Sequence, residues 1–538
     1  MAQARSASLR RIAALPLGIR FCMSLPGRPP PSPRRHRLRS AWWGPLSQRP
    51  QALPQHMWLP ACLLDVAITM ADGLPRLPPA NSSPKQEPGL CQQAVLAEIR
   101  GAWSLADNLR GIIDRPSGAL ECLDGLRALA VLWVIAYHSA TTWHWTLDPE
   151  IGGPSPAFYS LWAMQIPLHG EYGVDIFFVL SGFLISLQAM KELEKTGRIN
   201  YGGFLWARFW RIAPAFYVSI AIHLLLPGFS EMCRKNWWEL VLFLVGILPP
   251  KGCMVWTWSI SMEFQFYFIT PIVVRLACTE SGEPRRHCFK ILGGLSLLCQ
   301  AMRIILYYIY FEIEGSEHKA IDGITNKMWT RAHAYFFGIT ACVAYRIGLF
   351  RLKHHEEVIA QTMRCQALSL VDIFASLLVC FLAVIAGNGT SDGMIVEFFT
   401  RPQPALMLIL VSQCLFALGM SWLVFRICTK ELRILGAILS HRFWVPIARL
   451  SYGAYLLQFI SIMYVGHVGP WPHWKVLTMP DTTMCFVSYV GFYFAVALLT
   501  FFWALVLHLC VEAPCLKLRK VCTPGWLTRE GARPTGSD

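Results

Sequence analysis

Charged residues are scarce in this chain of 538 residues, because Asp, Glu, Lys and Arg together make up only 15% of it. Soluble proteins carry roughly 25% charged residues, so the composition argues against a soluble protein. The chain is 54% hydrophobic and 13% aromatic, with a mean hydropathy of +0.41, as is typical of a membrane protein. Its net charge of +15 does not indicate a nucleic-acid partner. The basic residues stand at the edges of apolar blocks, as lipid-headgroup and positive-inside residues do.

The cysteines also lack a pattern that would indicate a metal. The 18 Cys residues include no CxxC pair and have no His partners at zinc-ligand spacing. Most fall in or at the edges of apolar blocks, where Cys acts as a small hydrophobic residue; examples are Cys278, Cys299, Cys342, Cys380 and Cys414. The sequence therefore predicts no metal site.

Acidic residues are absent from residues 1–64, and the first fifty residues hold ten Arg. This composition is typical of a targeting presequence or a disordered basic tail, and a start codon assigned upstream of the true one is the alternative. We predict a disordered basic segment over 1–115, a transmembrane domain over 116–520 and a short cytoplasmic tail over 521–538.

Long apolar blocks predict the fold class, an all-α polytopic transmembrane helix bundle of about ten spans. Crossing about 30 Å of hydrocarbon takes roughly 17–25 residues in a helix. Blocks of suitable length lie near 126–143, 173–190, 212–229, 255–278, 289–311, 329–349, 367–388, 403–427, 444–466 and 482–511.

Charge predicts the orientation of these spans. The linker 144–172 has no Lys or Arg, whereas the linker 191–211 has five. Because basic residues concentrate on the cytoplasmic side, we expect 191–211 to be cytoplasmic and 144–172 to face outward or into a lumen. The short block 237–250 would export several later basic segments if it crossed, so we predict that it is re-entrant or interfacial. Both chain ends are then cytoplasmic, and the glycosylation sequon at Asn388 lies outside.

Two ionisable residues, Arg127 and His138, interrupt the first apolar span. Eleven steps of about 100° place them on one helix face, about 16 Å apart along the axis. Arg127 would lie near the cytoplasmic end and His138 near the bilayer midplane, where an ionisable group normally faces a cavity or a partner. The structural alternative is a His138 side chain that bonds to a neighbouring helix, with Arg127 reaching the headgroups.

Two further polar motifs lie in or beside apolar spans. Asp175, Ser181 and Gly182 share one span, and the Ser-Gly pair allows close helix approach, so packing alone explains them. Arg208 and Arg211 are helix neighbours at the predicted cytoplasmic membrane edge. Paired guanidinium groups suit phosphate, although such a pair is also a common positive-inside anchor.

Glu263 lies eight residues, about 12 Å, inside the outer end of its predicted span. This depth is close to the one expected for His138. A carboxylate and an imidazole at one depth make a candidate acid/base pair. The alternative is a polar clamp between helices that serves only stability.

Four stretches in this order resemble the acyltransferase-3 family of integral membrane O-acyltransferases. They are LDGLRALAVLWVIAYH (123–138), GVDIFFVLSGFLIS (173–186), RFWRIAP (208–214) and WSISMEFQFY (258–267). The resemblance covers about 120–515 and is most specific in its first 150 residues.

Later stretches resemble the family more weakly. LSYGAYLLQF (450–459) and VEAP (511–514) are similar to its late motifs, and MWTRAHAYFFG (328–338) resembles the eukaryotic branch related to the nose-resistant-to-fluoxetine proteins. One position departs from the pattern, because Gln458 stands where the late motif usually ends in His. An amide cannot act as a base, so the resemblance supports no second base there.

The resemblance implies transfer of an acyl group, usually acetyl, from cytoplasmic acyl-coenzyme A as co-substrate, with no permanently bound cofactor. The acceptor it implies is a hydroxyl of a sugar or glycan across the membrane. The family's arginine-x10-histidine motif falls on Arg127 and His138, its RxxR motif on Arg208 and Arg211, and its Trp/Glu motif on Trp258 and Glu263.

These correspondences imply roles for the residues. His138 is the expected base or acyl carrier, and Glu263 the group that holds its tautomer or steadies its charged form. Acyl-CoA binding is expected of Arg127, Arg208, Arg211 and Trp258. Supporting roles are expected of Asp124, Asp175, Ser181 and Gly182.

A membrane acyltransferase is thus the leading hypothesis. The alternative is a non-catalytic transporter or lipid- or drug-handling protein on the same helix bundle, which would move a solute without cleaving a thioester. A third hypothesis gives the polar residues a structural role only. The expected partners are acyl-CoA, a hydroxyl-bearing acceptor and membrane lipid, and the expected location is the plasma membrane or an endomembrane.

Overall fold

The computed structural model describes residues 97–115, 120–141, 161–226, 230–248, 253–315, 323, 326–354, 402–468 and 482–524. Helices account for most of these residues, and the part described contains no strand beyond isolated bridges. The predicted all-α class is therefore confirmed for the described chain. Its helices are α3 (Leu105–Ile113), α4 (Cys122–Thr141), α7 (Trp162–Leu168), α8 (Tyr172–Thr196), α9 (Tyr201–Leu225), α10 (Ser230–Val241), η1 (Val255–Thr257), α11 (Trp258–Ala277), α12 (Cys288–Tyr307), η2 (Tyr308–Ile313), α14 (Met328–His354), α17 (Pro402–Cys428), α18 (Arg433–Leu439), α19 (Trp444–Val468), α20 (Thr482–Leu507), η5 (His508–Glu512) and α21 (Ala513–Cys522).

Five helical segments among the described residues are, by length and composition alone, able to cross a membrane. They are Tyr172–Thr196, Val255–Ala277, Cys288–Tyr310, Val411–Cys428 and Cys485–Cys522. Four more predicted spans overlap with α4, α9, α14 and α19, although α9 begins at Tyr201, eleven residues before the predicted span 212–229. The predicted span 367–388 lies outside the described residues. The count of about ten spans stays a prediction.

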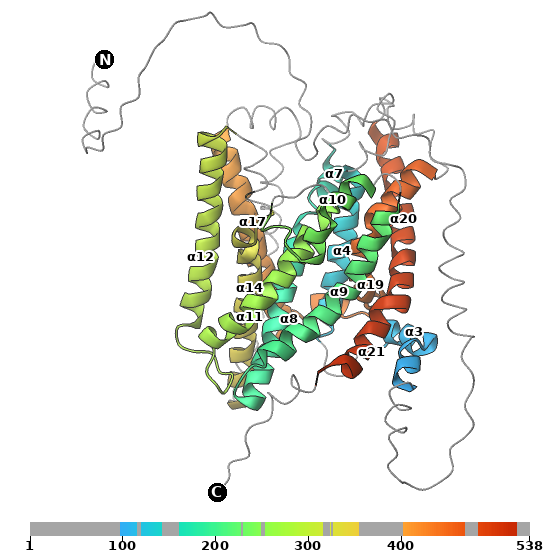
Figure 1. Ribbon diagram of the computed structural model, residues 1–538. Coiled ribbons are helices and arrows are strands. Elements are labelled where there is room, and N and C mark those ends of the chain that lie inside the picture. Colours follow the sequence, from blue (N-terminus) through green and yellow to red (C-terminus); the bar gives the residue numbers. More distant parts are fainter. Residues whose placement is uncertain are drawn as a thin grey trace, which may run out of the picture. The chain divides into compact units, whose positions relative to one another are not determined.

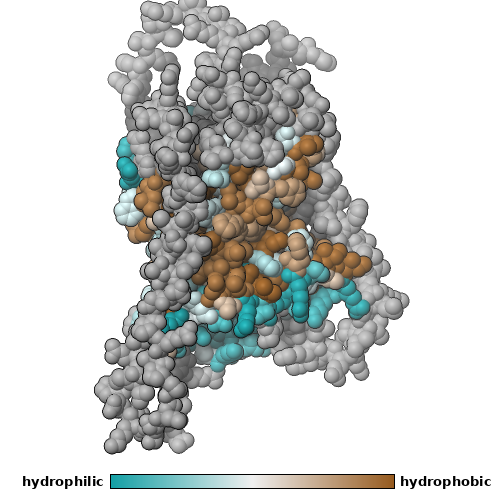
Figure 2. Space-filling view, turned by 90° about the vertical axis from the view of Figure 1, so that its right-hand side faces the viewer, coloured by the Kyte–Doolittle hydropathy of each residue, from teal (hydrophilic) through white to brown (hydrophobic). Residues whose placement is uncertain are grey.

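The surface of the molecule has the distribution expected of a membrane protein. Figure 2 shows one face with a broad hydrophobic band that is bordered below by hydrophilic residues. Exposed apolar side chains also follow α20, where Phe494, Leu498 and Phe502 are more than half exposed. Such a band would be unfavourable in water and is favourable against lipid.

The helix α4 has neighbours on several sides. It packs against α8, α18, α19 and α20. Two hydroxyls of α20 donate to its carbonyl oxygens, Tyr489 to Ala136 at 2.8 Å and Tyr493 to Leu132 at 3.3 Å. This packing fixes the helix that carries Arg127 and His138.

The helices α8 and α14 run parallel and in close contact. Their starts meet at Asp175 and Arg331, and their ends meet at Glu194 and Arg346. Between these points Gly338 leaves no space for a side chain, because a Cβ there would collide with the backbone of α8. Small residues at helix interfaces allow this close approach.

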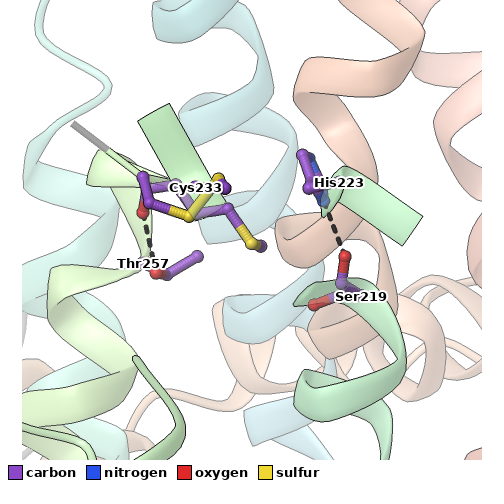
Figure 3. The surroundings of a disulfide bond; sticks show 6 residues. Ser219, His223, Cys233 and Thr257 are labelled. Carbon is purple, nitrogen blue, oxygen red and sulfur yellow. Dashed lines mark hydrogen bonds between the residues drawn. A yellow bond between two sulfur atoms is a disulfide. The ribbon is translucent and has the colours of Figure 1, made fainter. Parts of the chain in front are cut away.

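The segment around α10 begins and ends at one place. A disulfide joins Cys233 in α10 to Cys253 just before η1, with 4.6 Å between their Cα atoms (Figure 3). The Tyr217 hydroxyl donates to the Val241 carbonyl oxygen at 2.9 Å, which attaches the end of α10 to α9. A segment that returns to its starting point does not cross about 30 Å of hydrocarbon, as we expect for 237–250.

The sequence did not predict the disulfide, because most cysteines fall in or beside apolar blocks and were interpreted as small hydrophobic residues. Cys233 and Cys253 are twenty positions apart, so only the folded chain brings them together. Disulfides persist in oxidising compartments. The pair therefore agrees with an outward or lumenal location for α10, at the upper end of the bundle in Figure 1.

The N-terminal boundary needs a correction. Residues 1–115 are predicted to be disordered, but α3 is a helix at Leu105–Ile113. The Ser104 side chain caps it by accepting from the Asp107 backbone N–H, and the Trp103 indole donates to the Cys510 carbonyl oxygen at 3.3 Å. The Ser104 cap and the contact with Cys510 stabilise this helix. The composition of the preceding residues gave no sign of it.

Candidate functional site

His138 lies near the end of α4 and pairs with the late part of the chain. Its Nδ1 atom is 3.0 Å from the Gln458 Oε1 atom on α19. The rings of His138 and Phe459 are also in contact, with centroids 4.9 Å apart. The residue that departs from the family pattern is therefore the hydrogen-bond partner of the candidate base.

The orientation of the Gln458 amide determines what it offers to His138. Its Nε2 atom donates to the Tyr455 carbonyl oxygen at 3.0 Å, and its side chain is fully buried. The amide oxygen is then directed to His138 and accepts from an N–H at Nδ1. This arrangement selects the tautomer in which Nε2 is the acceptor nitrogen, the one a general base needs.

The same network continues to α11. The Tyr455 hydroxyl is 2.7 Å from the Ser259 hydroxyl and also bonds to the Trp256 carbonyl oxygen. The Trp256 ring stacks on Phe459 with centroids 3.9 Å apart. Helices α4, α11 and α19 are thus joined around His138 by polar and aromatic contacts.

Glu263 has different partners from those expected. Its Oε1 atom accepts from the Ser181 hydroxyl of α8 and, at 2.7 Å, from the Tyr267 hydroxyl one turn along α11. No hydrogen bond joins it to His138 in the described structure, so the expectation that Glu263 holds the His138 tautomer is not met. Along the α11 axis, Glu263 lies about 7.5 Å beyond Trp258. It is within electrostatic range of Arg127 and Arg208.

Arg208 and Arg211 occupy the first half of α9. The Arg208 guanidinium bonds to the Gln188 side chain and lies over the rings of Phe204 and Tyr267, at 5.2 and 5.9 Å from their centroids. Its Nε atom has no hydrogen-bond partner among the described residues. A guanidinium stacked on aromatic rings keeps N–H groups available for an anion.

Arg211 is paired with the late VEAP stretch. Its Nη1 atom is 3.6 Å from the Glu512 Oε1 atom, and the other Glu512 oxygen is 2.9 Å from the His508 Nδ1 atom. The Tyr452 hydroxyl donates to the Ile212 carbonyl oxygen at 2.9 Å, which attaches α19 to the same part of α9.

A cluster of four arginines forms around these residues. Arg127 of α4 is within electrostatic range of Arg211, of Arg449 on α19 and of Glu263, and Arg208 is within range of Arg211 and Glu263. We call Arg127, Arg208, Arg211 and Arg449 the arginine cluster. Three described carboxylates, those of Asp124, Glu263 and Glu512, lie within range of these four cations. The remaining positive charge favours an anionic ligand.

The arginine cluster and His138 occupy different levels of one bundle. Arg127 and His138 lie on the same helix, about 16 Å apart along its axis. The level of the arginine cluster suits an anion that enters from the side where the basic linker 191–211 joins α8 to α9. The level of His138, nearer the opposite side of the bundle, suits proton transfer. The geometry can therefore serve a long molecule with phosphates at one end and a reactive group at the other.

Comparison with known proteins identifies the family. A family model described as "Acyltransferase domain" matches residues 120–509. The chain belongs to the acyltransferase-3 family. Together with its apolar helices, this membership indicates an integral membrane protein.

Individual relatives cover parts of the chain. It is 31% identical over 225 residues to peptidoglycan O-acetyltransferase of Listeria monocytogenes, a match with 37% of this chain and 32% of that one. A putative O-acetyltransferase of Staphylococcus aureus is 28% identical over 228 residues, 39% of this chain and 32% of that one. Nose resistant to fluoxetine protein 6 of Caenorhabditis elegans is 23% identical over 430 residues, 70% of this chain and 50% of that one.

These matches span between a third and a half of the relatives' own lengths. No solved structure matches the chain.

The supporting positions have partners of their own. The Asp124 Oδ2 atom accepts a hydrogen bond from the Arg115 Nε atom at 3.1 Å. The Asp175 Oδ1 atom forms an ion pair with the Arg331 Nη2 atom at 3.0 Å. A Cβ at Gly182 would collide with the Tyr335 carbonyl oxygen of α14, so this glycine allows the close approach of α8 and α14. Trp258 begins α11, and the Arg331 guanidinium lies 5.6 Å from its ring centroid.

Sequence reasoning missed the residues that complete the site. Arg449, Glu512 and His508 join the arginines, and Tyr455 joins Gln458. The late motifs LSYGAYLLQF and VEAP contain two of them, Tyr455 and Glu512, so the resemblance was a usable signal. It did not tell which early residue each late one contacts.

Proposed function

We propose that this chain is an integral membrane O-acyltransferase that moves an acyl group, acetyl in the simplest case, from cytoplasmic acyl-CoA to a hydroxyl of a carbohydrate or other acceptor. The observation that carries the proposal is the placement of His138 and the arginine cluster at two levels along α4. Family membership and the O-acetyltransferases among the relatives support the reaction type.

The arginine cluster is suited to the donor. Coenzyme A carries several phosphate charges at one end and its thioester at the end of a long flexible arm. Guanidinium groups bind phosphate through paired N–H donors, and Arg208 has an N–H available. With the phosphates at this cluster, the arm would run along α4 and bring the thioester toward His138.

His138 is suited to activate the acceptor. Its Nε2 atom would take the proton of the acceptor hydroxyl while the oxygen attacks the thioester carbonyl carbon. A C–O bond forms, the C–S bond breaks, and the proton passes to the departing sulfur to give free coenzyme A. Gln458 would hold the imidazole in the required tautomer, the role expected earlier of Glu263.

Glu263 stays a candidate catalytic residue in this proposal, with a different task. It accepts from Ser181 and Tyr267 beside the arginines. Its carboxylate would fix these hydroxyls and balance part of the cluster's charge when no donor is bound.

Release of coenzyme A from acetyl-CoA by the purified full chain in liposomes tests the proposal. We expect release that depends on acceptor and falls at least about 10²-fold in His138→Ala, because a general base contributes typically 10²–10⁴-fold. Equal insertion and thermal stability of the two proteins is the control. Undiminished release by properly inserted His138→Ala, or no release by the wild type with any acceptor, would favour the non-catalytic transporter or lipid-handling alternative.

A further inference from the structure

A second polar cluster lies buried between α8, α12, α14 and α17. Asp175, Arg303, Arg331 and His333 each expose no more than 1% of their surface. The Arg331 Nη2 atom is 3.0 Å from the Asp175 Oδ1 atom, and the Arg303 guanidinium bonds to the Gln413 side chain of α17. We call these four residues the outer cluster, because they lie near the starts of α8 and α14.

Among the described residues, the outer cluster has more positive than negative charge. There, the Arg303 and Arg331 guanidinium groups lie within electrostatic range of one buried carboxylate, that of Asp175. A second described carboxylate, that of Glu171, is half-exposed at the start of α8 and lies beside the Tyr137 hydroxyl. A buried surplus charge is unfavourable unless another charge offsets it. The cluster is therefore suited to an anion.

Donor groups in the outer cluster lack acceptors. The Nε and Nη1 atoms of Arg331 are buried and have no hydrogen-bond partner among the described residues. Buried polar groups are nearly always hydrogen bonded. Because Nη2 is directed at Asp175, the Nε and Nη1 groups remain for a ligand with oxygen acceptors, and a carboxylate matches their planar spacing.

The outer cluster adjoins the network around His138. The Arg331 guanidinium lies over Trp258, whose neighbour Ser259 bonds to the Tyr455 hydroxyl. The backbone carbonyl oxygen of Tyr455 accepts from the Nε2 atom of Gln458, the partner of His138. The cluster lies at the end of α8 and α14 opposite the Glu194–Arg346 pair, which is the end expected to face the acceptor.

We propose that Arg331, with Arg303, binds a carboxylate carried by the acyl acceptor, so that the acceptor is an acidic sugar or another hydroxy acid. The proposal rests on the proposed function for its place in the reaction. The anion site itself rests on burial, charge and unpartnered donors. Asp175 is a positioning residue that fixes one side of the Arg331 fork.

Direct binding of glucuronate and glucose to the purified full chain, without acyl-CoA, tests the proposal. The two sugars differ only in the carboxylate, so we expect glucuronate to bind at least tenfold more tightly. Arg331→Lys keeps a cation for Asp175 and loses the planar fork, so it should bind glucuronate at least tenfold more weakly than the wild type.

Arg346→Lys is the matched control, because Arg346 pairs with Glu194 at the opposite end of the same two helices. It should bind glucuronate as the wild type does. Equal binding of the two sugars to the wild type, or no binding of glucuronate, overturns the proposal without reference to any variant. Unchanged glucuronate binding by Arg331→Lys overturns it as well.

Coenzyme A release separates this proposal from the proposed function. Selective glucuronate binding with no release from acetyl-CoA would leave the anion site in place and remove the acyltransferase function. If coenzyme A is released in the presence of acceptors but the wild type binds glucuronate and glucose equally, the acyltransferase function stands and the anion site is overturned.

Discussion

A single amide shows how much one residue can change the chemistry of this site. Gln458 cannot take a proton, yet its oxygen faces His138 and its nitrogen is held by Tyr455. A neutral partner fixes the imidazole tautomer without adding the negative charge that a carboxylate would bring. In the proposed function, His138 would therefore act as the base beside a neutral partner in place of a charged one.

Replacing Gln458 with Leu should lower kcat by roughly 10- to 100-fold with little change in the KM for either substrate. The reason is that the His138 imidazole would lose the hydrogen bond that orients it. Gln458→Glu retains an acceptor for Nδ1–H and should keep most of the turnover. The measurement is steady-state release of coenzyme A by both variants in liposomes. Equal losses in Leu and Glu variants of normal stability would contradict an orienting role.

Replacing both Arg208 and Arg211 with Gln should raise the KM for acyl-CoA at least about tenfold and leave that for the acceptor nearly unchanged. Lys at both positions should restore only part of the affinity, because a point charge does not reproduce the planar fork. Arg275→Gln is the control, since Arg275 is exposed on α11 and pairs with Glu280 outside the cluster. Matching changes in both Michaelis constants would count against a phosphate site.

At the scale of elements, α8 and α14 approach each other closely at two glycines. Gly338 faces the Val179 carbonyl oxygen, and Gly182 faces Tyr335. The contact brings Asp175 to Arg331 and holds Ser181 beside α11. Backbone proximity between two helices thus places side chains of both polar clusters.

Gly338→Ala should destabilise the protein by about 1–3 kcal/mol, the usual cost of forcing an extra group into a packed interface. Gly348→Ala, on the same helix, should have little effect, because the new Cβ would lie 4.0 Å from the Thr429 Cγ2 atom, an ordinary van der Waals contact. The midpoint of thermal unfolding in detergent is the measurement. A Gly338→Ala midpoint as high as that of Gly348→Ala would show that α8 separates from α14 at no cost.

The sequence predicted the elements better than their partners. Apolar length and charge located the helices that carry Arg127, His138 and Glu263, because both signals are local. Arg208 was expected in the linker 191–211 but lies in α9. The His138–Gln458 bond and the Arg211–Glu512 pair each join residues about 300 positions apart. No local pattern encodes which of several helices will lie next to another. Shared depth and the family motifs predict a contact between Glu263 and His138, whereas Glu263 bonds to Ser181 and Tyr267.

The whole molecule has two chemically distinct ends. In Figure 1, α7 and α10 lie at the upper end, and α3 and α21 lie at the lower end. The upper end carries the Cys233–Cys253 disulfide, and α21 at the lower end ends in Arg519 and Lys520. Disulfide chemistry and positive charge both agree with the predicted orientation, in which the lower end would be cytoplasmic.

Labelling of single cysteines from each side should confirm this orientation. Cysteines introduced for Ile247 and Glu283, both exposed, should label only from outside and only from the cytoplasm, respectively. The background should lack the other cysteines but retain Cys233 and Cys253, which hold α10 in place. Labelling of position 283 from outside would reverse the orientation and separate the arginine cluster from a cytoplasmic donor.

The pairing of Asp175 with Arg331 also has a consequence in time. About 150 residues separate the two in the chain, and ribosomes add roughly 5–20 residues per second. During synthesis Asp175 is therefore made about 8 to 30 s before its partner exists. Until α14 emerges, the Asp175 carboxylate lacks its Arg331 partner, so this part of the bundle completes its assembly only after α14 has been translated.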